Sequence, residues 1–166
     1  AKLGHLTGGA KYQELEHKVK SATGAEHWIE TPDKANASLF IAHRVELNKQ
    51  HPDYHATLMA NAIWGGDGFA SRLMQRIRVK EGYSYGTYSG LQLEFDEKGG
   101  IYYMVAIASP ENMNKVVAAY KEEVQRVLDD GFSQEELESA ISGQIKKLRS
   151  SWANEMAIAY LLGENK

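Results

Sequence analysis

The chain has 166 residues, which suits one domain with a substantial core, and its 43% hydrophobic and 25% charged content is typical of globular proteins. Its net charge of −3, with both signs mixed, gives no electrostatic footprint for nucleic acid or an anionic membrane, so we expect neither as a partner. Cysteine is absent, which excludes disulfides and thiolate ligands and is compatible with both the cytoplasm and the bacterial periplasm. No apolar run approaches the ~20 residues that are needed to span a bilayer.

The N-terminal part is predicted to be a lead-in. Leu15 and Val19 form the apolar side of a helix over Tyr12–Val19, and a break follows at Ser21–Gly24. We therefore predict residues 1–30 as a lead-in helix and linker from a preceding domain, and 31–166 as the main domain. Because the chain starts at Ala1 without a methionine and ends in a helical pattern, we expect a segment of a longer protein, truncated at the C-terminus.

Strand patterns occur in three places. Residues Ala37–Leu47 alternate, with His43 among apolar neighbours on one face. Tyr83–Phe95 also alternates, whereas Ile101–Ala108 is apolar on both faces and is predicted to be central in its sheet. The turn residues Asp96–Gly100 between the last two segments predict a hairpin.

Helical patterns fill the remaining chain. One helix is predicted from an N-cap at Asp53 to Trp64, and another follows Ser109-Pro110 and ends at Gly131. A capping box at Ser133–Glu136 predicts a final long helix. Beyond Trp152 this helix carries an apolar stripe formed by Met156, Ala157, Tyr160 and Leu161, which we expect to pack on the core, on another copy or on missing sequence. The order β, α, α, β, β, α, α predicts an α+β fold: an antiparallel-rich sheet with helices packed on one face.

The most informative stretch is Ser71–Gly86, which reads as an amphipathic helix feeding into a strand. Leu73 and Ile77 form its apolar side, and Gly82 is placed as a left-handed cap. Arg78 in the last helical turn and Tyr85 near the start of the strand could both point at one ligand. A structural alternative is that Arg78 only complements the helix dipole and that Tyr85 is a core residue.

The same stretch resembles the second, non-zinc domain of pitrilysin/insulinase-like zinc metallopeptidases, which share the mitochondrial-processing-peptidase fold. Their pattern S-R-L-x-x-x-(I/L)-R-E-K-x-G-L-x-Y is matched at eight positions and departs at Val79 and Tyr83; the matches are Ser71, Arg72, Leu73, Ile77, Arg78, Lys80, Gly82 and Tyr85. The resemblance implies that Arg78 binds substrate backbone carbonyls. It also implies that Tyr85 donates a hydrogen bond to the oxyanion in the partner domain's site.

The zinc motif of that family, H-x-x-E-H, is missing from this chain. The nearest sequence begins at His43 but has Leu47 where the second histidine is required. His51 and His55 are four residues apart without an evident acidic third ligand, so we interpret them as surface residues. No metal is therefore expected in this chain, and zinc is expected in a partner or preceding domain.

The resemblance implies a non-catalytic, substrate-binding half of a zinc metalloendopeptidase, expected to be inactive in isolation. Its implied partners are a peptide substrate and a zinc-bearing domain of the same polypeptide or of another subunit; a homo-oligomer is also compatible. The alternative is a catalytically silent structural or assembly subunit with the same fold. A phosphate cradle at Gly65–Gly68 is disfavoured, because the G-K-[ST] ending of a P-loop is missing.

Overall fold

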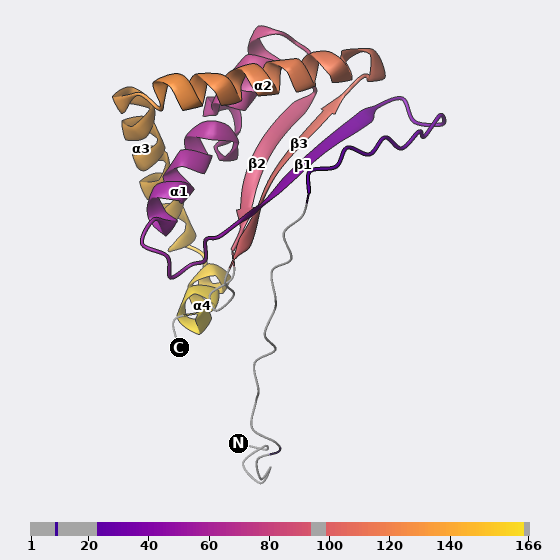
Figure 1. The fold of residues 1–166 in the computed structure, drawn as a ribbon. Coiled ribbons are helices and arrows are strands. Elements are labelled where there is room, and N and C mark those ends of the chain that lie inside the picture. Colours follow the sequence, from indigo (N-terminus) through magenta and orange to yellow (C-terminus); the bar gives the residue numbers. More distant parts are fainter. Residues whose placement is uncertain (1–8, 10–22, 94–98, 165–166) are drawn as a thin grey trace.

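The computed structural model describes residues 9, 23–93 and 99–164, and within them three antiparallel strands form one sheet (Figure 1). Their order is β1 (Ala37–Val45), β3 (Gly100–Ala108), β2 (Gly86–Gln92). In the centre of the sheet, Met104 pairs with Ile41 on one side and with Ser89 on the other. The predicted hairpin and the central position of its second strand are confirmed.

Helices cover one face of this sheet (Figure 1). In chain order they are α1 (Tyr54–Asn61), the π-helix η1 (Ala62–Gly66), the 3₁₀-helix η2 (Gly68–Ala70), the π-helix η3 (Met74–Lys80), the 3₁₀-helix η4 (Pro110–Asn112), α2 (Met113–Asp130), α3 (Gln134–Ser151) and α4 (Glu155–Glu164). Leu73 just before η3, Ile77 of η3, Met104 of β3 and Val116 of α2 are fully buried together in the core. The predicted α+β class, with helices on one face, is confirmed.

The opposite face of the sheet carries aromatic residues that remain partly exposed. The Tyr103 ring lies between Phe40 of β1 and Tyr88 of β2, at 6.3 Å from each ring centre. Gly90 makes this position possible, because a Cβ there would lie 2.5 Å from the Tyr103 ring. Phe40 is 66% exposed and Tyr88 49% exposed, so nothing in the described part of the chain covers this face fully.

Several local predictions are confirmed. The capping box is present: the Glu136 N–H donates to Ser133 Oγ at 3.2 Å, and the Ser133 N–H donates to Glu136 Oε2 at 2.8 Å. Gly131 ends α2 with a φ of +70°, a conformation that suits glycine. Asp53 occupies the N-cap position of α1, although its side chain makes no capping hydrogen bond.

Other predictions are wrong. The final helix is not continuous, because α3 ends at Ser151 and Asn154 accepts the Met156 N–H at 3.0 Å to begin α4. Met156 is 80% exposed, so the core does not cover it, and its cover by another copy or by further sequence stays a prediction. Leu128 fits the helical period on the buried side of α2, yet it is 74% exposed. His43 shares a face with apolar residues but is itself exposed.

Some predictions fall outside the described residues. They are the helix over Tyr12–Val19, the turn residues Asp96–Lys98, and the side chains of Tyr160 and Leu161. Residues 23–30 are described and have no regular secondary structure. The division of the chain at residue 30 stays a prediction.

Candidate functional site

The helix η3 is fixed to the core by its apolar side and by two arginines. The Arg72 guanidinium donates to both carboxylate oxygens of Glu136, at 2.5 and 2.7 Å, and to the Gly131 carbonyl at 3.0 Å. Arg76 is paired with Glu81 and donates to Glu122 Oε2 at 2.7 Å. Both arginine side chains are mostly buried, at 21% and 14% exposure, so both serve to attach η3 to α2 and α3.

These ion pairs shift the titration of the groups involved. The hydrogen bonds from Arg72 lower the pKa of the Glu136 carboxyl from 4.5 to about 2, with the capping hydrogen bond from Ser133 acting in the same direction. Hydrogen bonding to Glu136 in turn raises the pKa of Arg72. The bidentate pair therefore stays ionised throughout the neutral range and holds the start of η3 to the start of α3.

Arg78 differs from the other two arginines of this helix. Its side chain is exposed, and its guanidinium lies 4.8 Å above the ring of Phe69, which is itself 60% exposed. Within the described residues, the Arg78 guanidinium has no hydrogen bond and no ion pair. The cation–π contact limits where the group can go while leaving all of its donors available.

A tight turn connects η3 to β2. Gly82 has a φ of +66°, and its N–H donates to the Arg78 carbonyl at 3.0 Å. The Tyr83 N–H donates to the Ile77 carbonyl, also at 3.0 Å. These two bonds satisfy carbonyls that the helix end would otherwise leave free, and they reverse the chain toward the sheet. The predicted left-handed cap at Gly82 is confirmed.

Ser84 fastens the other end of this turn to the sheet. Its buried hydroxyl lies 2.7 Å from the Gly86 carbonyl and 2.8 Å from the Ile107 carbonyl, and it accepts the Gly86 N–H at 3.1 Å. The Tyr85 N–H donates to the Ile107 carbonyl at 2.8 Å. The backbone on both sides of Tyr85 is therefore held against β3. Sequence reasoning missed Ser84, because a serine between two tyrosines carries no distinguishing pattern.

Tyr85 itself points into solvent. It is 64% exposed, and within the described part of the chain its hydroxyl has no hydrogen-bond partner. The structural alternative of a core tyrosine is wrong, because the helices that bury Thr87 and Ser89 of β2 do not extend over Tyr85, which precedes the strand. The short turn thus brings two exposed polar groups, the Arg78 guanidinium and the Tyr85 hydroxyl, to the same end of the fold.

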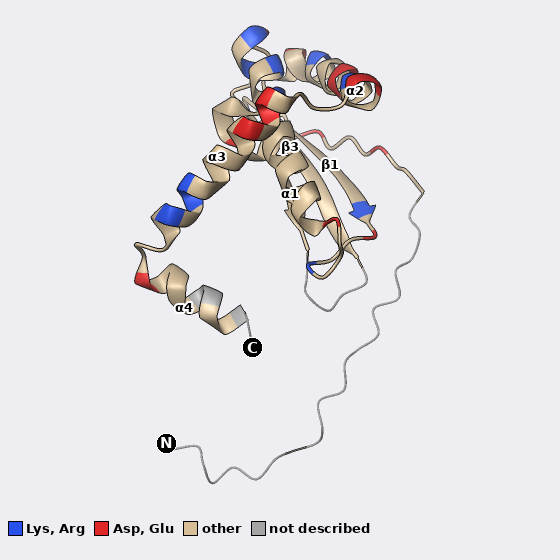
Figure 2. Cartoon of the chain, turned by 90° about the vertical axis from the view of Figure 1, so that its left-hand side faces the viewer, with Lys and Arg blue, Asp and Glu red and all other residues tan. Residues whose placement is uncertain are grey.

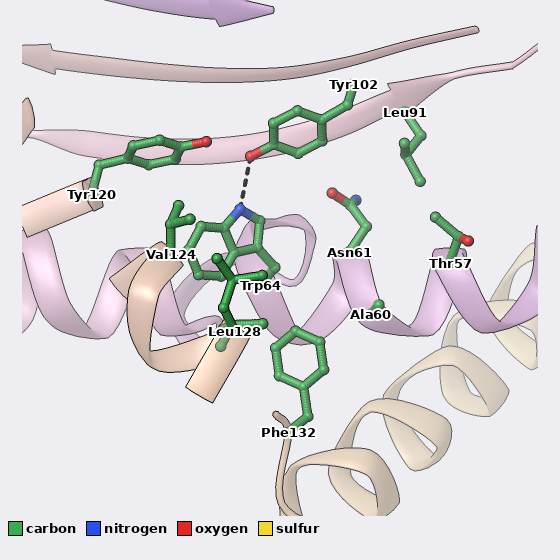
Figure 3. A pocket seen from close by; sticks show the side chains of 11 residues that line it. Thr57, Ala60, Asn61, Trp64, Leu91, Tyr102, Tyr120, Val124, Leu128 and Phe132 are labelled. Atoms are coloured by element: carbon green, nitrogen blue, oxygen red, sulfur yellow. Dashed lines mark hydrogen bonds between the residues drawn. The ribbon is translucent and has the colours of Figure 1, made fainter. Parts of the chain in front are cut away.

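An apolar pocket lies elsewhere, between α1, α2 and the sheet (Figure 3). Its volume is about 310 Å³, and Trp64 forms one wall with its indole N–H donating to the Tyr102 hydroxyl at 2.7 Å. Burial raises the pKa of the Tyr120 hydroxyl on the same wall. Asn61 is also engaged, since its Oδ1 accepts from Ser89 Oγ at 2.8 Å. Most polar groups of the pocket are thus already hydrogen-bonded within the protein. The pocket therefore offers space for apolar groups and few free polar groups that could act on a peptide bond.

No group of three or more histidine and carboxylate residues within the described ranges could hold a metal ion. The donor set for the zinc of a metallopeptidase is therefore not found among these residues, and no step of metal chemistry can be assigned to them. None of the helices in the described part is long and apolar enough to cross a membrane.

The fold is an α+β domain that presents two exposed polar side chains, Arg78 and Tyr85. The family described as "Peptidase M16 inactive domain" matches residues 2–144, and the chain belongs to that family. The resemblance drawn from Ser71–Gly86 is thereby confirmed. No protein with a curated description is significantly similar to the chain in sequence.

Solved structures share the fold. The peptidase M16 inactive domain from Pseudomonas fluorescens is 27% identical with a TM-score of 0.63, over 79% of this chain and 29% of that chain. A conserved protein from Enterococcus faecalis is 20% identical with a TM-score of 0.68, over 80% of this chain and 30% of that one. The chain thus spans about 30% of the length of these two relatives.

A third structure is nearer in length. The inactive peptidase domain of a candidate zinc protease from Bordetella parapertussis is 21% identical with a TM-score of 0.62, over 79% of this chain and 70% of that chain. At this identity the likeness shows the fold alone, as it does for the Enterococcus protein.

Proposed function

We propose that this domain is the non-catalytic, substrate-binding half of a zinc metalloendopeptidase. It would hold a peptide against a zinc-bearing domain of the same polypeptide or of a partner subunit. That zinc-bearing domain would activate water and hydrolyse the peptide bond. The observation that carries this proposal is the contrast within one helix. Arg72 and Arg76 form ion pairs that fix the fold, whereas the Arg78 guanidinium has no hydrogen bond or ion pair within the described residues.

In this proposal Arg78 binds the peptide backbone. A guanidinium stays charged at every relevant pH and offers donors in a fixed planar arrangement, which suits peptide carbonyls. Its place above the Phe69 ring restrains the side chain before substrate arrives, so less conformational entropy is lost on binding. Arg78 would therefore act mainly on substrate affinity.

Tyr85 would act on the transition state. A phenol hydroxyl can donate a hydrogen bond without titrating near neutral pH, and an oxyanion accepts it more strongly than the ground-state carbonyl does. The bonds from Ser84 and the Tyr85 N–H to the Ile107 carbonyl fix the backbone that carries the hydroxyl. Such preorganisation is what a donor to a developing charge requires.

The test uses the complete peptidase with its zinc-bearing domain and a long peptide substrate. Tyr85→Phe should lower kcat by a hundredfold or more, since deletion of one oxyanion donor costs about 2.7–4 kcal/mol. Arg78→Ala should mainly raise KM. Matched controls are Tyr88→Phe and Lys80→Ala, both at exposed positions of the same elements, and both should keep wild-type kinetics.

A wild-type kcat for a correctly folded Tyr85→Phe would refute the transition-state role. If Arg78→Ala also left KM unchanged, the alternative of a catalytically silent structural or assembly subunit would replace the proposal. Tyr85→Phe removes an exposed hydroxyl with no hydrogen bond inside the described fold, so we expect the unfolding free energy to change by less than about 0.5 kcal/mol. Arg78→Ala also loses the cation–π contact with Phe69, so we expect a loss of about 1 kcal/mol or less.

A further inference from the structure

Phe69 is an apolar side chain that the fold holds at the surface. It belongs to the short helix η2 and is 60% exposed, although its backbone is fixed on both sides. Its carbonyl accepts from Gln75 Nε2 at 2.5 Å, and the preceding carbonyl, that of Gly68, accepts from the Ser71 hydroxyl at 2.7 Å. The ring is therefore exposed on a segment whose backbone is held in place.

An ion pair anchors the same segment to α3. Basic residues occupy the second half of α3 (Figure 2), and one of them, Lys147, pairs with Asp67, which directly precedes η2 and is only 17% exposed. Gly143 permits this approach, because a Cβ at that position would lie 3.0 Å from Asp67 Oδ2. The segment is thus tied to η3 through Gln75 and to α3 through Asp67, which gives Phe69 a defined place beside the candidate site.

The Phe69 ring has free surface next to the group that is proposed to bind the peptide. The Arg78 guanidinium lies 4.8 Å from the ring centre, above one face of the ring. Since Phe69 is nevertheless 60% exposed, much of the remaining ring surface faces solvent. An aromatic surface beside a hydrogen-bond donor with free capacity is the composition of a ligand subsite, in which the polar group fixes orientation and the ring supplies apolar contact.

Peptide geometry brings a side chain within reach of this ring. A carbonyl oxygen that accepts from the Arg78 guanidinium lies about 2.9 Å from one of its nitrogens. The two residues that share this peptide bond have Cα atoms about 3.8 Å apart, and in an extended chain their side chains point to opposite sides. Because the guanidinium itself is 4.8 Å from the ring centre, one of the two side chains can lie against Phe69 while the other points away.

We propose that Phe69 is a specificity-determining residue, which accepts a large apolar side chain, aromatic or aliphatic, from a peptide residue next to the carbonyl that Arg78 binds. This inference rests on the proposed substrate-binding role of Arg78. Contact with such a side chain removes exposed ring surface from water, whereas an alanine at the same position leaves most of the ring uncovered. A lysine or arginine there is disfavoured by the charge of Arg78.

The test uses the complete peptidase with its zinc-bearing domain, and peptides that vary at one position at a time around the cleaved bond. Each position carries phenylalanine, leucine, alanine, glutamate or lysine in turn. At one position, wild type should show a kcat/KM for the phenylalanine and leucine peptides about two- to tenfold above that for the alanine peptide, the range of a single aromatic contact. Phe69→Ala should bring this ratio close to one. The ratio compares two peptides on one enzyme, so it cancels any general loss of affinity that follows a displacement of Arg78.

Two further variants serve as controls. Phe69→Leu keeps an apolar side chain and should retain part of the preference, although it loses the cation–π contact with Arg78. Phe40→Ala is the matched control, because Phe40 is 66% exposed on the opposite face of the sheet, and its loss should leave the ratio unchanged. Circular dichroism should show all three variants folded, since each changes an exposed ring.

A wild-type ratio near one at every position would overturn the inference, and so would a ratio that Phe69→Ala leaves unchanged. A preference for glutamate that Arg78→Ala abolishes would also overturn it, because Arg78 would then bind an acidic side chain. Failure of the proposed function looks different. In that case Arg78→Ala leaves KM unchanged, whereas failure of this inference alone leaves the effect of Arg78→Ala on KM in place and removes only the role of Phe69 in selectivity.

Discussion

Replacing Glu136 by glutamine should make the stability of the domain less dependent on acid. The folded-state pKa of Glu136 is about 2 against an ordinary value of 4.5, an interval worth about 3 kcal/mol at 1.36 kcal/mol per pKa unit. Because 29% of the side chain is exposed, solvent screening reduces the expected contribution to about 2 kcal/mol. Since the pKa is depressed by folding, this stabilisation is complete above about pH 5 and disappears as the pH falls toward 2.

Glutamine isolates the charge. It can still fill the third position of the capping box and still accept one hydrogen bond from Arg72, which keeps its contacts with the Gly131 carbonyl and the Phe132 ring. Urea unfolding followed by circular dichroism should show wild type more stable than Glu136→Gln by about 2 kcal/mol at pH 7, with less than half of that difference left at pH 3 and the two converging toward pH 2.

The control is Glu135→Gln in the same first turn of α3, where the side chain is exposed and, in the described part of the chain, unpaired. It removes the same helix-dipole interaction, worth about 0.3–1 kcal/mol, and no ion pair. If the difference between wild type and Glu136→Gln were the same at pH 7 and at pH 3, the stabilising effect would come from shape or hydrogen bonding, and the ion-pair explanation would be refuted.

Three further changes test the local structure. Gly82→Ala should cost about 1–2 kcal/mol in urea unfolding, because φ is +66° there with open space around it, and Gly82→Asn should cost less; equal costs would argue against a conformational cause. Gly65→Ala should cost about 1–3 kcal/mol, because its Cβ would lie 2.9 Å from the Ser89 backbone nitrogen, and an unchanged melting temperature would contradict this close approach. Trp64→Phe should cost about 1–3 kcal/mol by leaving the Tyr102 hydroxyl without its donor, and a neutral result in the same assay would mean that water replaces that bond.

Much of the fold could be predicted because its signals are local. The apolar run Ile101–Ala108 identified the central strand of the sheet, and the capping pair Ser133 and Glu136, three residues apart, marked the start of α3. Gly82, which follows η3, could also be predicted as a helix cap, because few residues other than glycine adopt a φ of +66°.

The remaining features depend on distance in the chain or on small geometric differences. A π-helical turn such as η3 has nearly the same apolar spacing as an α-helix, so the pattern from Leu73 to Ile77 could not separate them. The break before α4 depends on Asn154 as a cap, a signal that the helical spacing of apolar residues before and after it obscures. Leu128 fits the helical period of α2 and lines the apolar pocket, but the neighbouring elements cover it only in part and leave it 74% exposed.

The candidate site was also only partly predictable from the sequence. The sequence shows three arginines in one helical segment, and only the tertiary structure distinguishes the ion-paired Arg72 and Arg76 from the exposed Arg78. The partner of Arg72 is 64 residues away in the chain, and Glu122 is 46 residues from Arg76. Burial of Tyr85 was likewise undecidable from alternation, which identifies the face of a strand and not the length over which helices cover it.

The exposure of Arg78 and Tyr85 has a consequence for the history of this sequence. Neither side chain has a hydrogen bond within the described fold, and exposed positions of this kind usually change the unfolding free energy by less than about 0.5 kcal/mol when substituted. Random mutation could therefore erase both residues while every helix and strand stayed in place. The requirement to fold does not protect them, so any selection that maintains the pair must come from a molecule that the domain meets.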